Sequence, residues 1–367
     1  MITREWPLVP VYATAAVFFA FEQALIGDLA NPWWAACVLG FLFGVMMLSA
    51  FAVVRHSECL AEIFGEPYGT LILTFAITAI EVLMITAVML TGPAVSTTAR
   101  DTMFAVMMIV FNGMAGLVLL VGGLRYKEQT YNLQGANAFL AVIFPLAVIC
   151  LVLPNFTSAP GGTLSVLHEI FLIFMSVALY GIFLAVQTLR HRHYFLEHGE
   201  TDAAEMAPPW AGEMRDLRPA AYHGTLLVLY IVPIVLLSKK IAVPIDFSVR
   251  VIGAPEALVG FLVAALIMAP ESLSALRASL ANQLQRSINL LLGSVLASIS
   301  LTVPAVLAIG LLSDRMVVLG LEAVDMLLLL LTLACALLTY TSGRTNILQG
   351  AIHLLLFCGY VVLIFDR

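Results

Sequence analysis

Long apolar segments dominate this chain and restrict it to one fold class. Runs of about 17 or more apolar residues, the length that spans a bilayer as a helix, occur eleven times along the 367 residues. No water is available inside a bilayer to satisfy backbone N–H and C=O groups, so such segments must form helices. The expected spans cover residues 7–26, 33–53, 68–91, 102–123, 137–154, 165–189, 222–238, 256–276, 288–312, 322–341 and 347–365. The sequence therefore predicts an all-α, polytopic membrane protein with about eleven transmembrane helices.

Composition excludes several functions. Only 11% of the residues are charged, against about 25% in a soluble domain. The net charge of −6 provides no basic surface for nucleic acid. The sequence contains no Walker loop, no G-x-S-x-G elbow and no glycine-rich nucleotide fingerprint. We therefore expect no nucleic-acid partner, no enzymatic activity and no resident cofactor, and the lipid bilayer as the surroundings.

The positions of the charged residues predict an orientation and a division of the chain. Eleven Lys and Arg residues fall on the side of the N-terminus and six on the opposite side, which places the N-terminus in the cytoplasm. A polar segment rich in Glu, Asp and His separates two sets of five spans, and two copies of an odd-numbered unit insert with opposite orientations. The predicted parts are an extra N-terminal helix in 1–30, a five-helix repeat in 31–189, an acidic cytoplasmic loop in 190–220 and a second, inverted repeat in 221–367. The acidic loop either is merely solvated or gathers and senses cations.

Two carboxylates inside the apolar spans are the strongest functional signal. Glu81 follows Glu66 by 15 residues, and Glu271 follows Glu256 by the same interval. Each pair falls in the second span of its half, where an inverted repeat requires it. With a rise of about 1.5 Å per residue, the second Glu of each pair lies roughly 20 Å into a core about 30 Å thick. Because an ionised group at this depth is costly, both acids indicate a functional site.

Hydroxyl and amide groups accompany Glu81. Thr74 and Thr78 precede it on the same helix face. Threonines in membrane helices also bond their own backbone, but a carboxylate on the same face favours a site. The candidate ligands in the neighbouring spans are Ser294 and Ser298, which share a helix face with Thr302, and Asn112.

The surroundings of Glu271 differ because Pro270 directly precedes it. Proline provides no N–H for the carbonyl group four residues earlier and clashes with it, so we expect the helix to bend or break near Leu266. Carbonyl groups freed in this way are tolerated at membrane depth where they line a cavity or meet an ion. Ser274 lies one turn beyond Glu271 and is a further candidate ligand.

These groups predict a site for hard cations and protons. Ligation by oxygen alone favours Ca²⁺, Mg²⁺, Na⁺ or K⁺, and the desolvated carboxylates bind protons when the cation is absent. With Glu81 and Glu271 as the metal ligands, one site would hold either cation or protons, which is the basis of antiport. A passive cation channel is the alternative, since helices lined with oxygen atoms and central acids also describe a pore.

Several motifs carry a resemblance to a known family. The segments are Val53–His56, Gly65–Gly69, Ala269–Glu271, Gly293–Pro304 and Ser342–Asn346. They resemble those of the bacterial calcium/proton (sodium-potassium/proton) antiporters in the cation/proton exchanger branch of the calcium/cation antiporter superfamily. The resemblance implies eleven spans, two inverted five-span repeats and a mid-membrane site made by spans 3 and 8, flanked by spans 4 and 9. It also implies a bacterial cytoplasmic (inner) membrane, with inorganic cations and protons as the transported partners.

The chain departs from the wider exchanger branch next to both acids. In that branch each acid ends a Gly-Asn-Ala-x-Glu motif, and a histidine follows in the second repeat. Here residues 77–81 read Ile-Thr-Ala-Ile-Glu, and residues 267–272 read Ile-Met-Ala-Pro-Glu-Ser. Both asparagines and the histidine are missing, which leaves fewer neutral ligands. Exchange of Ca²⁺ and exchange of monovalent Na⁺ or K⁺ alone both stay open.

Overall fold

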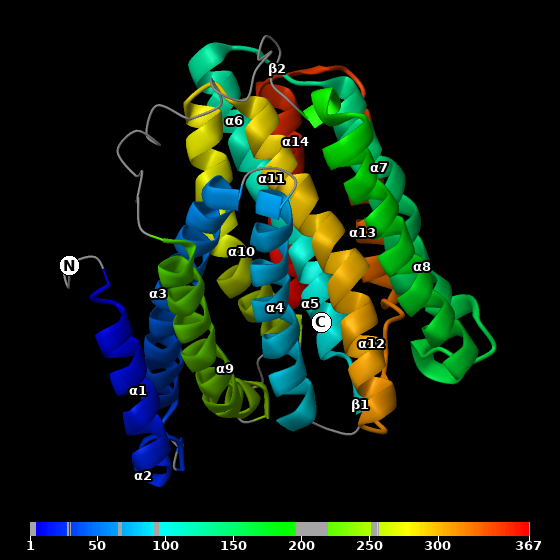
Figure 1. Ribbon diagram of the computed structural model, residues 1–367. Coiled ribbons are helices and arrows are strands. Elements are labelled where there is room, and N and C mark those ends of the chain that lie inside the picture. Colours follow the sequence, from blue (N-terminus) through cyan, green and yellow to red (C-terminus); the bar gives the residue numbers. More distant parts are fainter. Residues whose placement is uncertain are drawn as a thin grey trace.

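The computed structural model describes residues 5–64 except 28 and 30, then 68–91, 95–195, 219–250, 255 and 257–366. Most of the predicted acidic loop, together with Glu66 and Glu256, lies outside the described residues. The described chain is a bundle of helices that run roughly along one direction (Figure 1). The α-helices are α1 (Leu8–Ala20), α2 (Glu22–Ile26), α3 (Pro32–Phe64), α4 (Tyr68–Thr91), α5 (Thr98–Met107), α6 (Ala115–Tyr126), α7 (Leu133–Ala147), α8 (Val166–Ala185), α9 (Ala220–Arg250), α10 (Ala257–Leu280), α11 (Leu284–Ala297), α12 (Val303–Leu312), α13 (Ala323–Thr339) and α14 (Ile347–Phe365).

These helices confirm the predicted membrane architecture. Among the described residues, eight helices are long and apolar enough to cross a bilayer, and three shorter apolar helices accompany them. The largest differences from the expected limits are in the first, second and seventh spans, and in the seventh α9 continues to Arg250 instead of ending at residue 238. The first span is interrupted at Phe21, between α1 and α2, and α3 continues to Phe64 instead of ending at residue 53.

Two spans change from α-helical to π-helical geometry near their centres. The segment η1 (Met108–Met114) joins α5 to α6, and η7 (Ser298–Thr302) joins α11 to α12. Both interruptions lie in the third span of their halves and begin 190 residues apart, the interval that also separates Glu81 from Glu271. The remaining short helical segments are η2 (Val148–Val152), η3 (Leu153–Phe156), η4 (Pro160–Gly162), η5 (Val186–Arg190) and η6 (Arg192–Phe195). Because π-turns inside helices often occur at functional sites, η1 and η7 direct attention to the centre of the bundle.

Two short ladders join loops of the two halves. Strand β1 (Val95–Ser96) pairs in parallel with β3 (Met316–Val317), with Val95 opposite Met316. Strand β2 (Gln129–Thr130) pairs antiparallel with β4 (Arg344–Thr345), with Gln129 opposite Thr345. The two ladders lie at opposite ends of the bundle (Figure 1). They connect the two halves at both ends and add no sheet core.

The predicted break near Leu266 is wrong. Helix α10 runs from Ala257 to Leu280 without interruption, and Pro270 lies inside it. A single proline removes one N–H donor from the helical ladder, while the other hydrogen bonds of the helix are retained. In a water-poor interior no solvent competes for those bonds, so proline is tolerated inside a membrane helix.

A polar cluster attaches the N-terminal segment to α3 and α9. The Glu5 carboxylate accepts hydrogen bonds from Arg55 at 2.6 Å and from the Tyr230 hydroxyl at 3.0 Å. His56 lies 3.3 Å from Glu5 and 3.0 Å from the ring of His223. Burial acts to raise the pKa of Glu5, but Arg55 and His56 bring it below its ordinary value. Glu5 is therefore ionised near neutral pH and holds together the flank made by α1, α3 and α9 (Figure 1).

Helices α6 and α14 pack closely against each other at glycine residues. A Cβ atom on Gly350 would meet the backbone nitrogen of Leu120 and the carbonyl oxygen of Gly116. A Cβ atom on Gly116 would lie 2.9 Å from the backbone nitrogen of Leu354. The two backbones therefore approach each other at a distance that only glycine permits, as in other packed membrane helices.

This contact predicts that Gly350→Ala destabilises the fold. The added methyl group would overlap backbone atoms that cannot rotate away, and overpacking of this kind costs about 1–3 kcal/mol. We expect a lower unfolding temperature of the purified protein in detergent. Gly359→Ala is the matched control, since it lies on the same helix with nothing within 4 Å of its Cβ position. Equal stability of the two variants would contradict this account of the α6–α14 contact.

Candidate functional site

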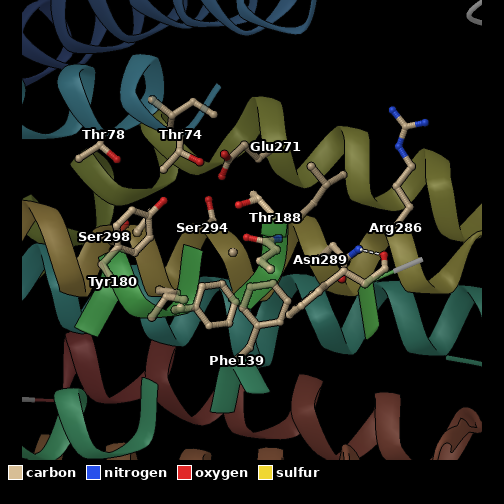
Figure 2. A pocket seen from close by; sticks show the side chains of 18 of the residues that line it. Thr74, Thr78, Phe139, Tyr180, Thr188, Glu271, Arg286, Asn289, Ser294 and Ser298 are labelled. Carbon is tan, nitrogen blue, oxygen red and sulfur yellow. Dashed lines mark hydrogen bonds between the residues drawn. The ribbon is translucent and has the colours of Figure 1, made fainter. Parts of the chain in front are cut away.

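One cavity contains both intramembrane acids. It has a volume of about 250 Å³, and helices α4, α8, α10 and α11 contribute lining residues that include Glu81 and Glu271. Aromatic side chains, among them Phe139 and Phe183, cover part of its wall. Figure 2 shows the hydroxyl groups of the lining directed into the same space as the Glu271 carboxylate. The polar lining residues besides the acids are Thr74, Thr78, Tyr180, Gln187, Thr188, Arg192, Arg286, Asn289, Ser294 and Ser298.

Glu81 is fixed by two hydroxyl groups from the opposite half of the chain. Its Oε2 atom accepts hydrogen bonds from Ser298 Oγ at 2.8 Å and from Thr302 Oγ1 at 2.9 Å. These residues lie four positions apart in η7 and therefore face the same helix, α4. Only 1% of Glu81 is exposed, and its Oε1 atom has no hydrogen-bond partner among the described residues. One oxygen atom of this carboxylate is held and the other is open to a ligand.

Glu271 lacks comparable support. It is 9% exposed, and its buried Oε2 atom has no hydrogen-bond partner among the described residues. The charged groups that act on it electrostatically are Glu81 and Glu58, both of which are acids. Arg286 also lines the cavity, but its charge acts on Glu58. Among the described residues, no basic side chain is hydrogen-bonded to either acid, although Arg192 and Arg286 line the same cavity. Two like charges in a desolvated cavity are a costly arrangement unless protons or cations neutralise them.

The cavity reaches the surface at one end of the bundle. It extends to Arg192, an exposed residue just after α8, and to Arg286, near the start of α11. In Figure 2, Arg286 lies at one end of the row of labelled side chains, and Thr78 and Ser298 lie at the other. Because successive spans alternate in direction, the end of α8 and the start of α11 fall on the side of the N-terminus. The cavity that contains the acids therefore extends toward that side.

The structure brings together six of the eight expected site residues. Those that line the cavity are Glu81, Glu271, Thr74, Thr78, Ser294 and Ser298. Ser274 is half-buried and does not belong to the lining, although it lies less than one turn from Glu271. Asn112 is also outside the lining and is hydrogen-bonded to Thr332 and His353. Ser274 was expected from its place on the helix face of Glu271, and Asn112 from its place in the neighbouring span. Neither position is enough to bring the side chain into the cavity lining.

Several residues at the site were not among the expected ligands. Thr302 holds Glu81, and its four-residue spacing from Ser298 was the available sequence signal. Tyr180, Thr188 and Asn289 also line the cavity. No pattern around these three residues singles them out, because only the packing of α8 and α11 against α4 and α10 directs them to the acids.

Comparisons with known proteins agree with this architecture. The sequence profile of the sodium/calcium exchanger protein family matches residues 33–189 and 223–365. The sodium-potassium/proton antiporter ChaA of Escherichia coli is 39% identical over 368 residues, which cover 99% of this chain and 96% of that protein.

Solved structures share the fold. Native YfkE superposes with a TM-score of 0.75 at 15% identity, covering 98% of this chain and 100% of the other. Selenium-substituted YfkE, described as a Ca²⁺/H⁺ antiporter, gives a TM-score of 0.70 at 18% identity and covers 99% and 100% of the two chains. The family profile covers most of the chain in two segments, and the similarity to ChaA extends over nearly its whole length. This chain therefore belongs to the sodium/calcium exchanger protein family.

Proposed function

We propose that this protein is a secondary-active cation/proton antiporter. The observation that carries the proposal is the pair of buried carboxylates, Glu81 and Glu271, in one cavity with an unpartnered oxygen atom on each. Two such oxygen atoms, to which no basic side chain is hydrogen-bonded among the described residues, form an anionic site for a hard cation or for protons. Similarity to ChaA, a sodium-potassium/proton antiporter, and to YfkE, a Ca²⁺/H⁺ antiporter, supports the same activity.

The electrostatics of the site provide the coupling. A cation bound between the two carboxylates displaces protons, and protons on the carboxylates remove the charge that binds the cation. An empty site keeps two negative charges in a medium of low dielectric constant, which opposes reorientation of the site across the membrane. Only the loaded forms then cross, so cation and proton movements are exchanged by alternating access.

Seven residues at the site have a proposed part in this exchange. Glu81 and Glu271 alternately hold cation and proton. The hydroxyl groups of Thr74, Thr78, Ser294 and Ser298 provide neutral oxygen atoms for the partly dehydrated ion. Thr302, together with Ser298, orients the Glu81 carboxylate through the hydrogen bonds to Oε2.

The proposed direction of transport follows from the side on which the cavity opens. The excess of Lys and Arg assigns the side of the N-terminus to the cytoplasm of a bacterium. The structure then corresponds to a state open to the cytoplasm, in a protein of the cytoplasmic (inner) membrane. Cations enter from the cytoplasm and leave in exchange for protons that move inward. The transported ions we propose are Ca²⁺, Na⁺ and K⁺, and no enzymatic step is required.

Everted membrane vesicles distinguish this antiporter from a passive cation channel. With respiration building a pH gradient and the membrane voltage clamped, addition of the transported cation should dissipate the gradient. A fluorescent pH dye reports the effect, and vesicles without the protein serve as the control. Comparing Ca²⁺, Na⁺ and K⁺ in the same assay identifies the preferred cation. Cation entry without proton exit under the clamp would instead support the channel.

Neutralising either acid should abolish exchange. We expect Glu81→Gln and Glu271→Gln to lose cation-dependent proton movement, because each leaves one carboxylate, too little to alternate between cation and protons. The amount of protein in the membrane should be unchanged. Glu128→Gln is the control, since the Glu128 side chain is 61% exposed and lies 3.7 Å from Arg344 outside the cavity. Retained exchange in either cavity variant would remove these acids from the mechanism.

The hydroxyl groups of η7 should set the apparent cation affinity. Ser298→Ala and Thr302→Val each remove one hydrogen bond to Glu81. We expect the KM for the cation to rise about tenfold, the change that corresponds to the free energy of one hydrogen bond to a charged group. Ser300→Ala is the matched control, because Ser300 lies in the same segment and its hydroxyl group has no hydrogen-bond partner among the described residues. A KM that changes equally in all three variants would indicate a general effect on η7 rather than support of Glu81.

A further inference from the structure

The two halves of the protein place different side chains beside their acids. The π-helical segments begin at Met108 and Ser298, separated by the same 190 residues that separate Glu81 from Glu271. On this interval the counterpart of Thr302 is Asn112. Thr302 donates a hydrogen bond to the acid of the other half. Asn112 is the residue that would do the same for Glu271.

Asn112 lies at nearly the same depth as Glu271. Helix α10 and the continuous span formed by α5, η1 and α6 run in the same direction. Near one end, a Cβ atom on Gly260 would approach the Asp101 carbonyl oxygen to 2.7 Å, and near the other, Ser279 Oγ donates to the Val118 carbonyl oxygen at 2.9 Å. Glu271 and Asn112 each lie 11 residues beyond the Gly260–Asp101 contact. Counted back from the Ser279–Val118 contact, Glu271 lies 8 residues away (279 − 271) and Asn112 lies 6 (118 − 112), so the two side chains lie within about two residues of the same level.

Asn112 is nevertheless held away from Glu271. Its Nδ2 atom donates to Thr332 Oγ1 at 2.8 Å, and its Oδ1 atom lies 3.1 Å from His353 Nδ1. The amide oxygen can only accept, so His353 carries its proton on Nδ1 and donates it to Asn112. Its Nε2 atom then accepts from Thr339 Oγ1 at 3.0 Å. Both Asn112 and His353 are 0% exposed, and helices α13 and α14 supply these partners.

We propose that His353 is a positioning residue for the transport site: together with Thr332 it holds the Asn112 amide away from Glu271 and keeps that carboxylate available to the transported ion. This inference rests on the proposed antiport. The position of Asn112 explains why Glu271 Oε2 has no hydrogen-bond partner among the described residues. The equivalent acid, Glu81, accepts hydrogen bonds from two donors. If the Asn112 amide were released, its N–H group could donate to Glu271 Oε2, which is the oxygen atom that Glu271 offers to the cation, and would then compete with the cation. At Glu81 the two donors bind Oε2 and leave Oε1 without a partner among the described residues.

Transport kinetics in vesicles test this role. We expect His353→Leu to raise the KM for the cation about tenfold, the range given by one hydrogen bond to a charged group, with a smaller change in the maximal rate. His353→Gln should stay close to the wild-type KM, because its amide N–H can still donate to Asn112. Adding Asn112→Leu to His353→Leu should bring the KM back toward the wild-type value, since no amide is left to reach Glu271.

A second substitution keeps the test decisive if the His353→Leu variant does not insert into the membrane. Thr332→Val is nearly isosteric and removes the acceptor of the Asn112 N–H group, so it should raise the KM in the same direction. Thr102→Val is the matched control, because Thr102 is buried in the same span as Asn112 and has no hydrogen-bond partner among the described residues.

Specific outcomes would overturn the proposal. They are an unchanged KM in Thr332→Val, or a KM that stays raised when Asn112→Leu is combined with His353→Leu. A purely structural role of His353 would lower the amount of inserted protein or the maximal rate and leave the KM unchanged. Failure of the antiport itself would be evident separately, since wild-type vesicles would then show no cation-dependent proton movement.

Discussion

The burial of two carboxylates in one cavity, each with an oxygen atom that has no hydrogen-bond partner among the described residues, is the constraint on which the rest of the site depends. An ionised acid removed from water costs several kcal/mol unless it is paired or hydrogen-bonded. Glu81 is compensated in part by Ser298 and Thr302, whereas the buried oxygen of Glu271 has no partner among the residues that the structure describes. The remaining cost is removed only by a bound cation or by protons. In the proposed mechanism, exchange between the two is a consequence of the site's electrostatics, and the cavity provides the ions with a path to the acids.

The site combines related positions with unequal surroundings. Glu81 and Glu271, and the π-helical segments that begin at Met108 and Ser298, repeat at one interval along the chain. The hydroxyl groups on η7 face the acid of the other half, but the amide on η1 faces α13 and α14 instead. One carboxylate is therefore held in place and the other is left open. A cation between them would meet one oriented and one adaptable ligand, which suits a site that must also release its ion.

Sequence reasoning was most successful where one physical rule acts alone. The eleven apolar segments became helices because backbone groups in a bilayer have no other hydrogen-bond partners, and most limits differed from the structure by only a few residues. The extension of α3 to Phe64 was not anticipated, since hydropathy marks where lipid contact ends and not where a helix ends. Of the bend or break expected near Leu266, the break was wrong, because the loss of one donor at Pro270 does not outweigh the other hydrogen bonds of the helix. The division into two repeats and an acidic loop stays a prediction.

The sequence by itself determined the fold class, the two acids and the hydroxyl stripes that accompany them, because these depend on local composition and helix periodicity. Only the tertiary structure decided which polar groups meet. Ser298 and Thr302 contact Glu81 from more than 200 positions away, Tyr180 and Asn289 line the cavity, and Asn112 is turned away from the acids toward His353. Periodicity assigns a residue to a face of its own helix. Which neighbour that face meets depends on the packing of the whole bundle, and therefore on contacts that no single segment encodes.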